Sequence, residues 1–125
     1  MKTEVWFIDD DGDNRAQFEE HYGGRYDVEA FDSPLDAFNC TGSPDVFLID
    51  CSAVGSLRMP QLMYAPICSL ITKHPEARYL LRSAMPVEFT QNVVDDVKRE
   101  CPEARIRAID WGDDPERLFV RRKAR

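Results

Sequence analysis

The chain has 125 residues, a mass of 14.4 kDa and a formal net charge of −7. This length allows one domain with a sizeable core, and the negative charge argues against a domain body that binds nucleic acid directly. No apolar run approaches the roughly 20 residues of a transmembrane helix, and acidic residues come too early for a signal peptide. The composition therefore predicts a cytoplasmic protein without membrane contact.

The four cysteines are far apart in sequence and form no CxxC pair: Cys40, Cys51, Cys68 and Cys101. This spacing indicates neither a zinc site nor a disulfide framework, so we expect reduced thiols. Four of the last five residues are basic. We expect one domain over residues 1–120 and a short solvated basic tail over 121–125.

The first half of the chain alternates short apolar runs with amphipathic stretches. β-Branched and aromatic residues predict strands over residues 4–9, 25–31 and 45–50. A helix is expected over 14–22 with Asp13 as N-cap, and a shorter one through Leu35, Ala37 and Phe38 after Ser33-Pro34. The first and third of these strands are apolar on both faces, and both end in aspartate.

The second half begins with a less regular segment. Gly55, Pro60 and Pro66 predict a long loop or broken helix over 51–66, before a helix over 67–74. A helix with an apolar stripe follows the strand expected over 78–85; the stripe consists of Phe89, Val93, Val97 and Cys101. A last strand is expected over 104–110 and a short last helix over 113–120.

Strands that alternate with helices predict an α/β fold, with a single five-stranded parallel sheet flanked by helices on both faces. In such sheets, ligands bind at the carboxyl ends of the strands, where the strand order reverses. Five polar residues are placed at these ends: Asp9, Asp10, Asp50, Ser83 and Asp110. We therefore expect them at one edge of the sheet.

Three segments, FIDDDGDNR, PDVFLID and YLLRSA, together resemble the flavodoxin-like receiver domain of two-component response regulators over nearly the whole chain. The resemblance implies that Asp9 and Asp10 hold Mg²⁺. It implies that Asp50 accepts a phosphoryl group from a sensor histidine kinase and completes the metal site with the backbone carbonyl of Ser52. Ser83 matches the family's switch hydroxyl, which turns toward the phosphoryl group.

The chemistry of these residues supports the same expectation. A carboxylate is a poor nucleophile toward an anionic donor, and a divalent ion offsets the charge and aligns the oxygens. Mg²⁺ prefers oxygen ligands, usually a few carboxylates with several retained waters. Without a cation, crowded carboxylates repel one another, so the pKa of at least one of them should rise.

The sequence also departs from the receiver pattern. No lysine stands near the end of the fifth strand, and by register Asp110 takes the place of that cation, unless Arg82 compensates for it. The segment CSAVGSLRMP replaces the usual residues after the phosphorylated aspartate. The family's aromatic residue on the fifth strand is replaced by Ile106 or Arg107. The chain thus resembles an atypical receiver.

Two other functions stay open. A pseudo-receiver would act as a phosphorylation-independent interaction module through the fourth helix, fifth strand and fifth helix, with Trp111 beside Phe119 as an anchor if it is not part of the core. A phosphatase of the haloacid-dehalogenase type is suggested by the resemblance of Asp9-Asp10-Asp11-Gly12 to its DxDG motif, with Asp9 as nucleophile. Ser83, Lys98 and Gly112-Asp113 would supply its other motifs, and Asp50 would have no role.

No output domain follows the receiver-like segment, so we expect a stand-alone signalling protein. Phosphorylation would change the binding of a downstream protein or cause homodimerisation through the fourth and fifth helices. The protein would be a phosphoacceptor rather than a turnover enzyme. His21 and His74 lie on predicted helices without carboxylate partners, and we expect both at the surface.

Overall fold

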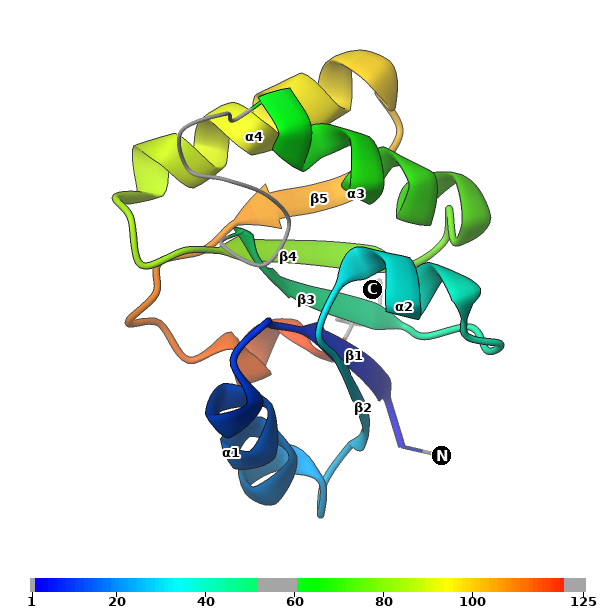
Figure 1. Cartoon of the computed structure of the whole chain (residues 1–125), viewed down its shortest axis with the longest axis vertical. Helices are drawn as coiled ribbons and strands as arrows, with labels where there is room; N and C mark the ends of the chain where they lie inside the picture. Colours follow the sequence, from blue (N-terminus) through cyan, green and yellow to red (C-terminus); the bar gives the residue numbers. More distant parts are fainter. Residues whose placement is uncertain (1, 52–60, 121–125) are drawn as a thin grey trace, which may run out of the picture.

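One five-stranded sheet forms the centre of the molecule. The computed structural model describes residues 2–51 and 61–120. All strand pairs are parallel, and the order across the sheet is β2-β1-β3-β4-β5 (Figure 1). The strands are β1 (Glu4–Ile8), β2 (Asp27–Phe31), β3 (Val46–Asp50), β4 (Arg78–Arg82) and β5 (Arg105–Ala108). The predicted α/β fold with a single parallel sheet is confirmed.

Helices cover both faces of this sheet. They are α1 (Gly12–Tyr22), α2 (Pro34–Asn39), α3 (Gln61–Lys73) and α4 (Val87–Glu100). Helices α2, α3 and α4 lie on one face, and α1 lies on the other with the C-terminal segment (Figure 1). The chain therefore turns back across the sheet between β2 and β3, which makes β1 and β3 the neighbours at the point where the strand order reverses.

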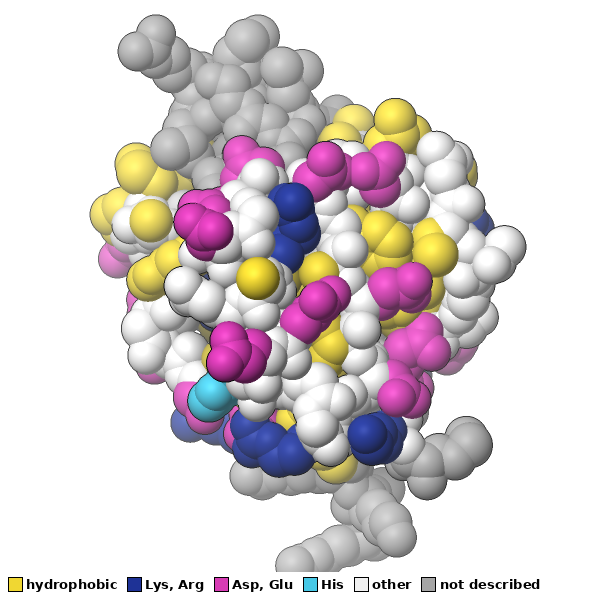
Figure 2. Space-filling model, turned by 60° about the horizontal axis from the view of Figure 1, so that its bottom comes forward, with side chains coloured by type: hydrophobic (Ala, Val, Ile, Leu, Met, Phe, Trp, Pro, Cys, Tyr) yellow, Lys and Arg dark blue, Asp and Glu magenta, His cyan; other side chains and the backbone are white. Residues whose placement is uncertain are grey.

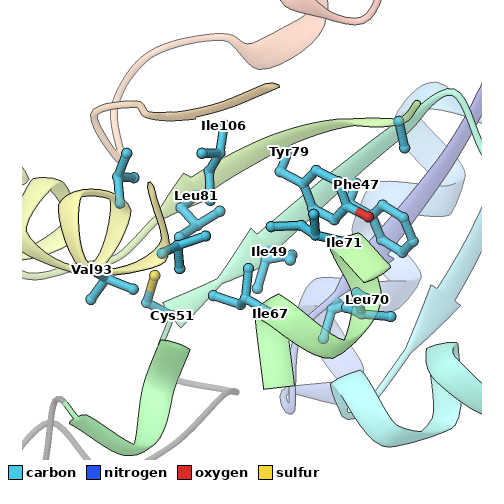
Figure 3. Packing of buried hydrophobic residues seen from close by; sticks show 14 of the residues in the cluster. Phe47, Ile49, Cys51, Ile67, Leu70, Ile71, Tyr79, Leu81, Val93 and Ile106 are labelled. Carbon is cyan, nitrogen blue, oxygen red and sulfur yellow. The ribbon is translucent and has the colours of Figure 1, made fainter. Parts of the chain in front are cut away.

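The core on the α3 face, here called the α3-side core, is built from strand residues and the apolar sides of three helices. Figure 3 shows Ile67, Leu70 and Ile71 of α3 directed at the strand residues Phe47, Ile49 and Tyr79. The rings of Phe47 and Tyr79 stack with centroids 4.8 Å apart. The apolar stripe predicted for the fourth helix enters this core through Val93 and Val97, which are almost fully buried.

The core on the opposite face, the α1-side core, is mainly aromatic. Phe7 of β1 stacks on Phe18 of α1 with ring centroids 4.2 Å apart. Tyr22 and Tyr26 pack edge-on against Phe119, which is completely buried. Residues at both ends of the chain therefore close this face of the sheet together.

The last predicted helix, over 113–120, is wrong in type and extent. The described part of this segment contains a single 3₁₀ helix, η2 (Pro115–Leu118), which Asp114 caps. Arg78 of β4 donates hydrogen bonds to the carbonyls of Leu118 and Phe119. Because a side chain satisfies these carbonyls, they do not need the amides of a further helical turn.

Two other boundaries differ from the predicted ones. Helix α1 is capped by Asp11, not Asp13, because the Asp11 carboxylate accepts hydrogen bonds from the amides of Asp13 and Asn14. Helix α3 starts at Gln61, ahead of the predicted residue 67, and contains Pro66. A proline inside a helix removes one backbone hydrogen bond, but the helix continues past Pro66 to Lys73. Most of the predicted segment over 51–66 lies outside the described residues.

One predicted surface histidine is buried. His21 is exposed, but only 8% of His74 is accessible, and its ring packs edge-on against Trp6 at a centroid distance of 5.6 Å. Burial lowers the pKa of His74, and the nearby Lys73 ammonium lowers it further. The predicted helix ended at this residue, and no local pattern indicates that β1 places an aromatic ring beside it.

This burial predicts that acid destabilises the fold through His74. In the unfolded chain, His74 has the ordinary pKa of about 6.5 and binds a proton below that pH, whereas the native His74 stays neutral to a lower pH. The free energy of unfolding therefore falls as the pH drops. His74→Leu should flatten this dependence between about pH 7.5 and 5.5. Urea denaturation of both proteins across this range measures it. Parallel pH profiles would show that His74 titrates normally.

Acidic side chains outnumber basic ones on one face of the molecule. On the face shown in Figure 2, Asp and Glu side chains are spread over the molecule and basic side chains are few. Within the described ranges, no helix is long and apolar enough to cross a bilayer.

Candidate functional site

Asp9 and Asp50, called the acidic pair below, meet at the point where the strand order reverses. Asp9 directly follows β1, Asp50 is the last residue of β3, and the register aligns Ile8 with Ile49. Side chains alternate along a strand, so both carboxyls lie on the same face as Phe7 and Leu48 of the α1-side core. Only 1% of Asp9 and 3% of Asp50 is accessible. The predicted proximity of these two residues is what the structure shows.

Local hydrogen bonds fix the side chain of Asp9. Its Oδ1 accepts a hydrogen bond of 2.9 Å from the amide of Asp11, and its Oδ2 accepts one of 3.2 Å from the Asn14 side chain. Arg15 donates to the backbone carbonyl of Asp9 at 2.8 Å. Sequence reasoning missed Asn14 and Arg15, although polar residues in the first turn of a helix that follows a strand end are placed to reach back to it.

The two carboxylates of the acidic pair repel each other in the metal-free protein. Burial raises the pKa of Asp9, and the neighbouring Asp50 carboxylate raises it further. The Asp11 amide and the Asn14 side chain act in the opposite direction, because their hydrogen bonds favour the ionised form. A positive charge beside the pair would relieve the repulsion, and this is the physical basis for cation binding.

The three consecutive carboxylates Asp9, Asp10 and Asp11 have different positions. Asp9 is buried, whereas Asp10 is exposed and Asp11 caps α1. Ser52, whose carbonyl was predicted as a metal ligand, lies outside the described residues. Across residues 2–51 and 61–120, no group of three or more Asp, Glu, His or Cys is arranged to hold a metal ion. The acidic pair supplies two buried carboxylates, a donor set that suits Mg²⁺ with retained waters.

This repulsion predicts that neutralising one carboxylate stabilises the metal-free protein. Because its native pKa is raised, ionised Asp9 destabilises the fold above that pKa, and this cost vanishes once both states are protonated. Asp9→Asn should therefore raise the free energy of unfolding at pH 7 in EDTA by about 1 kcal/mol, with a smaller gain at pH 4. Urea denaturation measures this. Asp10→Asn, at an exposed position, is the control and should change stability by less than about 0.5 kcal/mol.

Two small polar side chains lie near the acidic pair: Cys51 follows Asp50 in the chain, and Ser83 follows β4, the strand beside β3. Ser83 directly follows β4 and is 2% exposed; its hydroxyl oxygen accepts a hydrogen bond of 2.9 Å from the amide of Met85. Cys51 is fully buried, and burial, together with the Asp50 charge, raises the pKa of its thiol to about 12. The Cys51 thiol therefore stays protonated and unreactive at neutral pH.

The end of β5 corrects one expectation. Asp110 is exposed and follows the strand, whereas the side chain of Ile109 is buried in the α1-side core. The amide of Ile109 donates a hydrogen bond of 2.8 Å to the carbonyl of Leu81, which continues the pairing with β4. Ile109, not Asp110, therefore occupies the last inward position on the face of the acidic pair. The predicted replacement of a cation by a negative charge is wrong, because an apolar side chain stands there.

A different cation lies beside the acidic pair. Arg82, the last residue of β4, is the Cα partner of Asp50 and shares its face of the sheet. Its guanidinium carbon lies 4.8 Å from the ring centroid of Trp111 and 5.6 Å from that of Phe7. Trp111 is 44% exposed and is therefore not part of the core, whereas Phe119 is completely buried. The exposed pair of Trp111 and Phe119, which the pseudo-receiver alternative would use as an anchor, does not form.

No family model and no curated protein matches the chain. Several solved structures resemble it. The receiver domain of DrrB, activated with BeF3, shares 16% identity at a TM-score of 0.70, over 95% of this chain and 92% of that one. A response regulator from Thermotoga maritima shares 11% identity at a TM-score of 0.68, over 95% and 92%.

A third similar structure carries the modification expected here. It is a response regulator protein from Burkholderia pseudomallei with a phosphorylated aspartic acid, a calcium ion and citrate. It shares 15% identity at a TM-score of 0.67 over 94% of this chain, which spans 64% of that protein. The likeness to these structures shows that the chain has the receiver-domain fold.

Proposed function

We propose that this receiver-like protein accepts a phosphoryl group on Asp50, with Mg²⁺ bound, and that the modification changes its protein partners. The observation that carries the proposal is the acidic pair, two buried carboxylates at the point of strand-order reversal. Its support comes from the receiver fold and from the position of Asp50 at the end of β3.

In the proposed reaction, a carboxylate oxygen of Asp50 attacks the phosphorus of a phosphohistidine or of acetyl phosphate. A new P–O bond forms, the bond to the leaving group breaks, and the leaving group departs with the electron pair. The product is an aspartyl phosphate. Bound Mg²⁺ would supply positive charge that offsets the phosphoryl oxygens.

The chain's own residues prepare this reaction. Asp9 and Asp50, with Asp10 and the Ser52 carbonyl, would hold the ion, and Asn14 orients the Asp9 carboxylate through its hydrogen bond. Burial keeps bulk water away from the attacking oxygen of Asp50. The Ser83 hydroxyl, now bonded to the Met85 amide, would turn toward the phosphoryl oxygens and so report the modification.

The modified protein would signal through contacts with another protein. A sensor histidine kinase is the expected phosphoryl donor, and a downstream protein the expected reader. The surface formed by α4 and β5 is the proposed place for this contact or for homodimerisation. The expected contribution of a fifth helix is absent from this surface, because the described C-terminal segment forms η2 instead.

The phosphatase and pseudo-receiver alternatives make different use of the site. A phosphatase with Asp9 as nucleophile leaves Asp50 without a task, although Asp50 is buried against it. The pseudo-receiver is favoured by Ile109, which places an apolar side chain where receivers carry their lysine. Its partner binding would not depend on Asp50.

The test is intact-mass spectrometry after incubation with acetyl phosphate, with Mg²⁺ or with EDTA. The proposal predicts that the mass of the protein increases by one phosphoryl group in the Mg²⁺ buffer and stays unchanged in the EDTA buffer. An unchanged mass in both buffers, from a protein that is folded by circular dichroism, would favour the pseudo-receiver.

A further inference from the structure

We propose that Arg82 supplies the positive charge for the phosphoryl group on Asp50, and does so from β4 instead of β5. This inference rests on the proposed function, because it names the cation of the same site. It would explain how a receiver fold with Ile109 at the end of β5 still stabilises a phosphorylated aspartate.

The sheet itself places the two groups side by side. Asp50 and Arg82 are paired residues on adjacent strands, and both are the last residues of their strands. Their side chains lie on the same face, since the ring of Phe7 in the α1-side core contacts the Arg82 guanidinium. The backbone register therefore fixes this proximity.

The environment of Arg82 favours a role toward an anion. Burial lowers the pKa of Arg82, whereas the charges of Asp50 and Asp9 act in the opposite direction, and a guanidinium stays protonated throughout. Its Nε is buried and has no hydrogen-bond acceptor within the described parts of the chain. An unsatisfied buried donor is costly, and a phosphoryl oxygen would provide an acceptor for it.

Two aromatic rings hold the guanidinium. Phe7 belongs to the core, and Trp111 is half-exposed, so Trp111 covers Arg82 from the solvent side. A cation–π contact restrains the plane of the guanidinium without using its hydrogen-bond donors. Trp111 is thus a positioning residue for Arg82.

The space beside Arg82 also borders Asn14, one of the residues around the acidic pair. A solvent-open cavity of about 260 Å³ is lined by Arg82, Trp111 and Asn14, among others. Asn14 also donates the hydrogen bond to Oδ2 of Asp9. Arg82 and Asn14, the residue that orients Asp9, therefore line the same cavity.

Phosphorylation of Asp50 adds negative charge that Arg82 would compensate. One divalent ion compensates the two carboxylates of the acidic pair, but the phosphoryl group brings further negative charge. A guanidinium binds phosphoryl oxygens with two parallel hydrogen bonds, which a point charge does not.

The experiment compares Arg82→Met, Arg82→Lys and the wild type in two assays. The first is the rate of phosphoryl transfer from acetyl phosphate to Asp50, followed by intact mass. The second is the affinity for Mg²⁺ alone, measured by calorimetry. Arg107→Met, at an exposed position of β5, is the matched control.

Arg82→Met should slow the transfer at least about tenfold, and Arg82→Lys should recover part of the rate. The affinity of Arg82→Met for Mg²⁺ should equal or exceed that of the wild type, because this substitution removes a positive charge that repels the ion. A residue with a merely structural role would lower both quantities together. Arg107→Met should leave both unchanged.

Two results would overturn the inference, and they are distinguishable. If the wild type forms the adduct and Arg82→Met forms it equally fast, Arg82 has no such role, while the proposed function stands. If the wild type forms no adduct, both proposals fail. Should Arg82→Met not fold, Trp111→Leu tests the same point at the surface and should slow transfer by several fold; an unchanged rate would contradict the inference.

Discussion

Asp50→Asn should abolish the Mg²⁺-dependent phosphoryl adduct completely. Asparagine has nearly the same shape as aspartate, but its amide has no negatively charged oxygen. It therefore lacks the nucleophile that attacks the phosphorus. The fold should survive, because the substitution also removes one of two buried, mutually repelling carboxylates. Intact-mass spectrometry after incubation with acetyl phosphate and Mg²⁺ measures the loss.

A matched control is available on the same sheet. Asp27 is exposed at the amino end of β2, at the opposite edge from the acidic pair, and Asp27→Asn should form the adduct at the wild-type rate. An adduct that persists in Asp50→Asn but disappears in Asp9→Asn would contradict the account and favour the phosphatase mechanism.

Trp6→Ala should lower the free energy of unfolding by about 3–5 kcal/mol. Trp6 is completely buried, and its ring contacts Phe31 and Phe47 at centroid distances of 5.0 and 5.6 Å. Its indole N–H donates to Glu4 at 2.9 Å, so the substitution also leaves a cavity next to an unused acceptor. Equilibrium urea denaturation measures the loss.

Trp111→Ala is the natural comparison for this prediction. Trp111 is 44% exposed, and its described ring contact is with Arg82. Its loss should cost at most about 1 kcal/mol. Similar losses for the two tryptophans would mean that the α3-side core does not depend on Trp6.

The sequence identified the main elements because their patterns are local. β1 and β3 are apolar on both faces, and this pattern is typical of the central strands of a parallel sheet. Trp6 in β1 is completely buried, as this pattern requires. Ser33-Pro34 marked the start of α2 correctly, because N-cap chemistry involves only neighbouring residues.

Tertiary contacts decided the elements that the sequence did not reveal. The 3₁₀ form of η2 depends on Arg78, which is far away in the chain and binds its terminal carbonyls. The burial of His74, which follows α3, depends on the ring of Trp6 in β1. Neither partner is visible from a local pattern.

The candidate site divides in the same way. Asp9 and Asp50 were predictable, since carboxyl ends of adjacent parallel strands meet at one edge. The exposure of Asp10 and the capping of α1 by Asp11 were not predictable, because both depend on where α1 begins. The face on which Arg82 and Ile109 lie depends on the register and extent of β4 and β5, and a one-residue shift in register reverses it.

The most direct test of the account is to locate the phosphoryl group. The wild-type protein is incubated with acetyl phosphate and Mg²⁺, the acyl phosphate is reduced to an alcohol with borohydride, and the peptides are sequenced by mass spectrometry. The account predicts modification of Asp50 in Mg²⁺ and none in EDTA. Modification of Asp9 instead, or of neither residue, would contradict it.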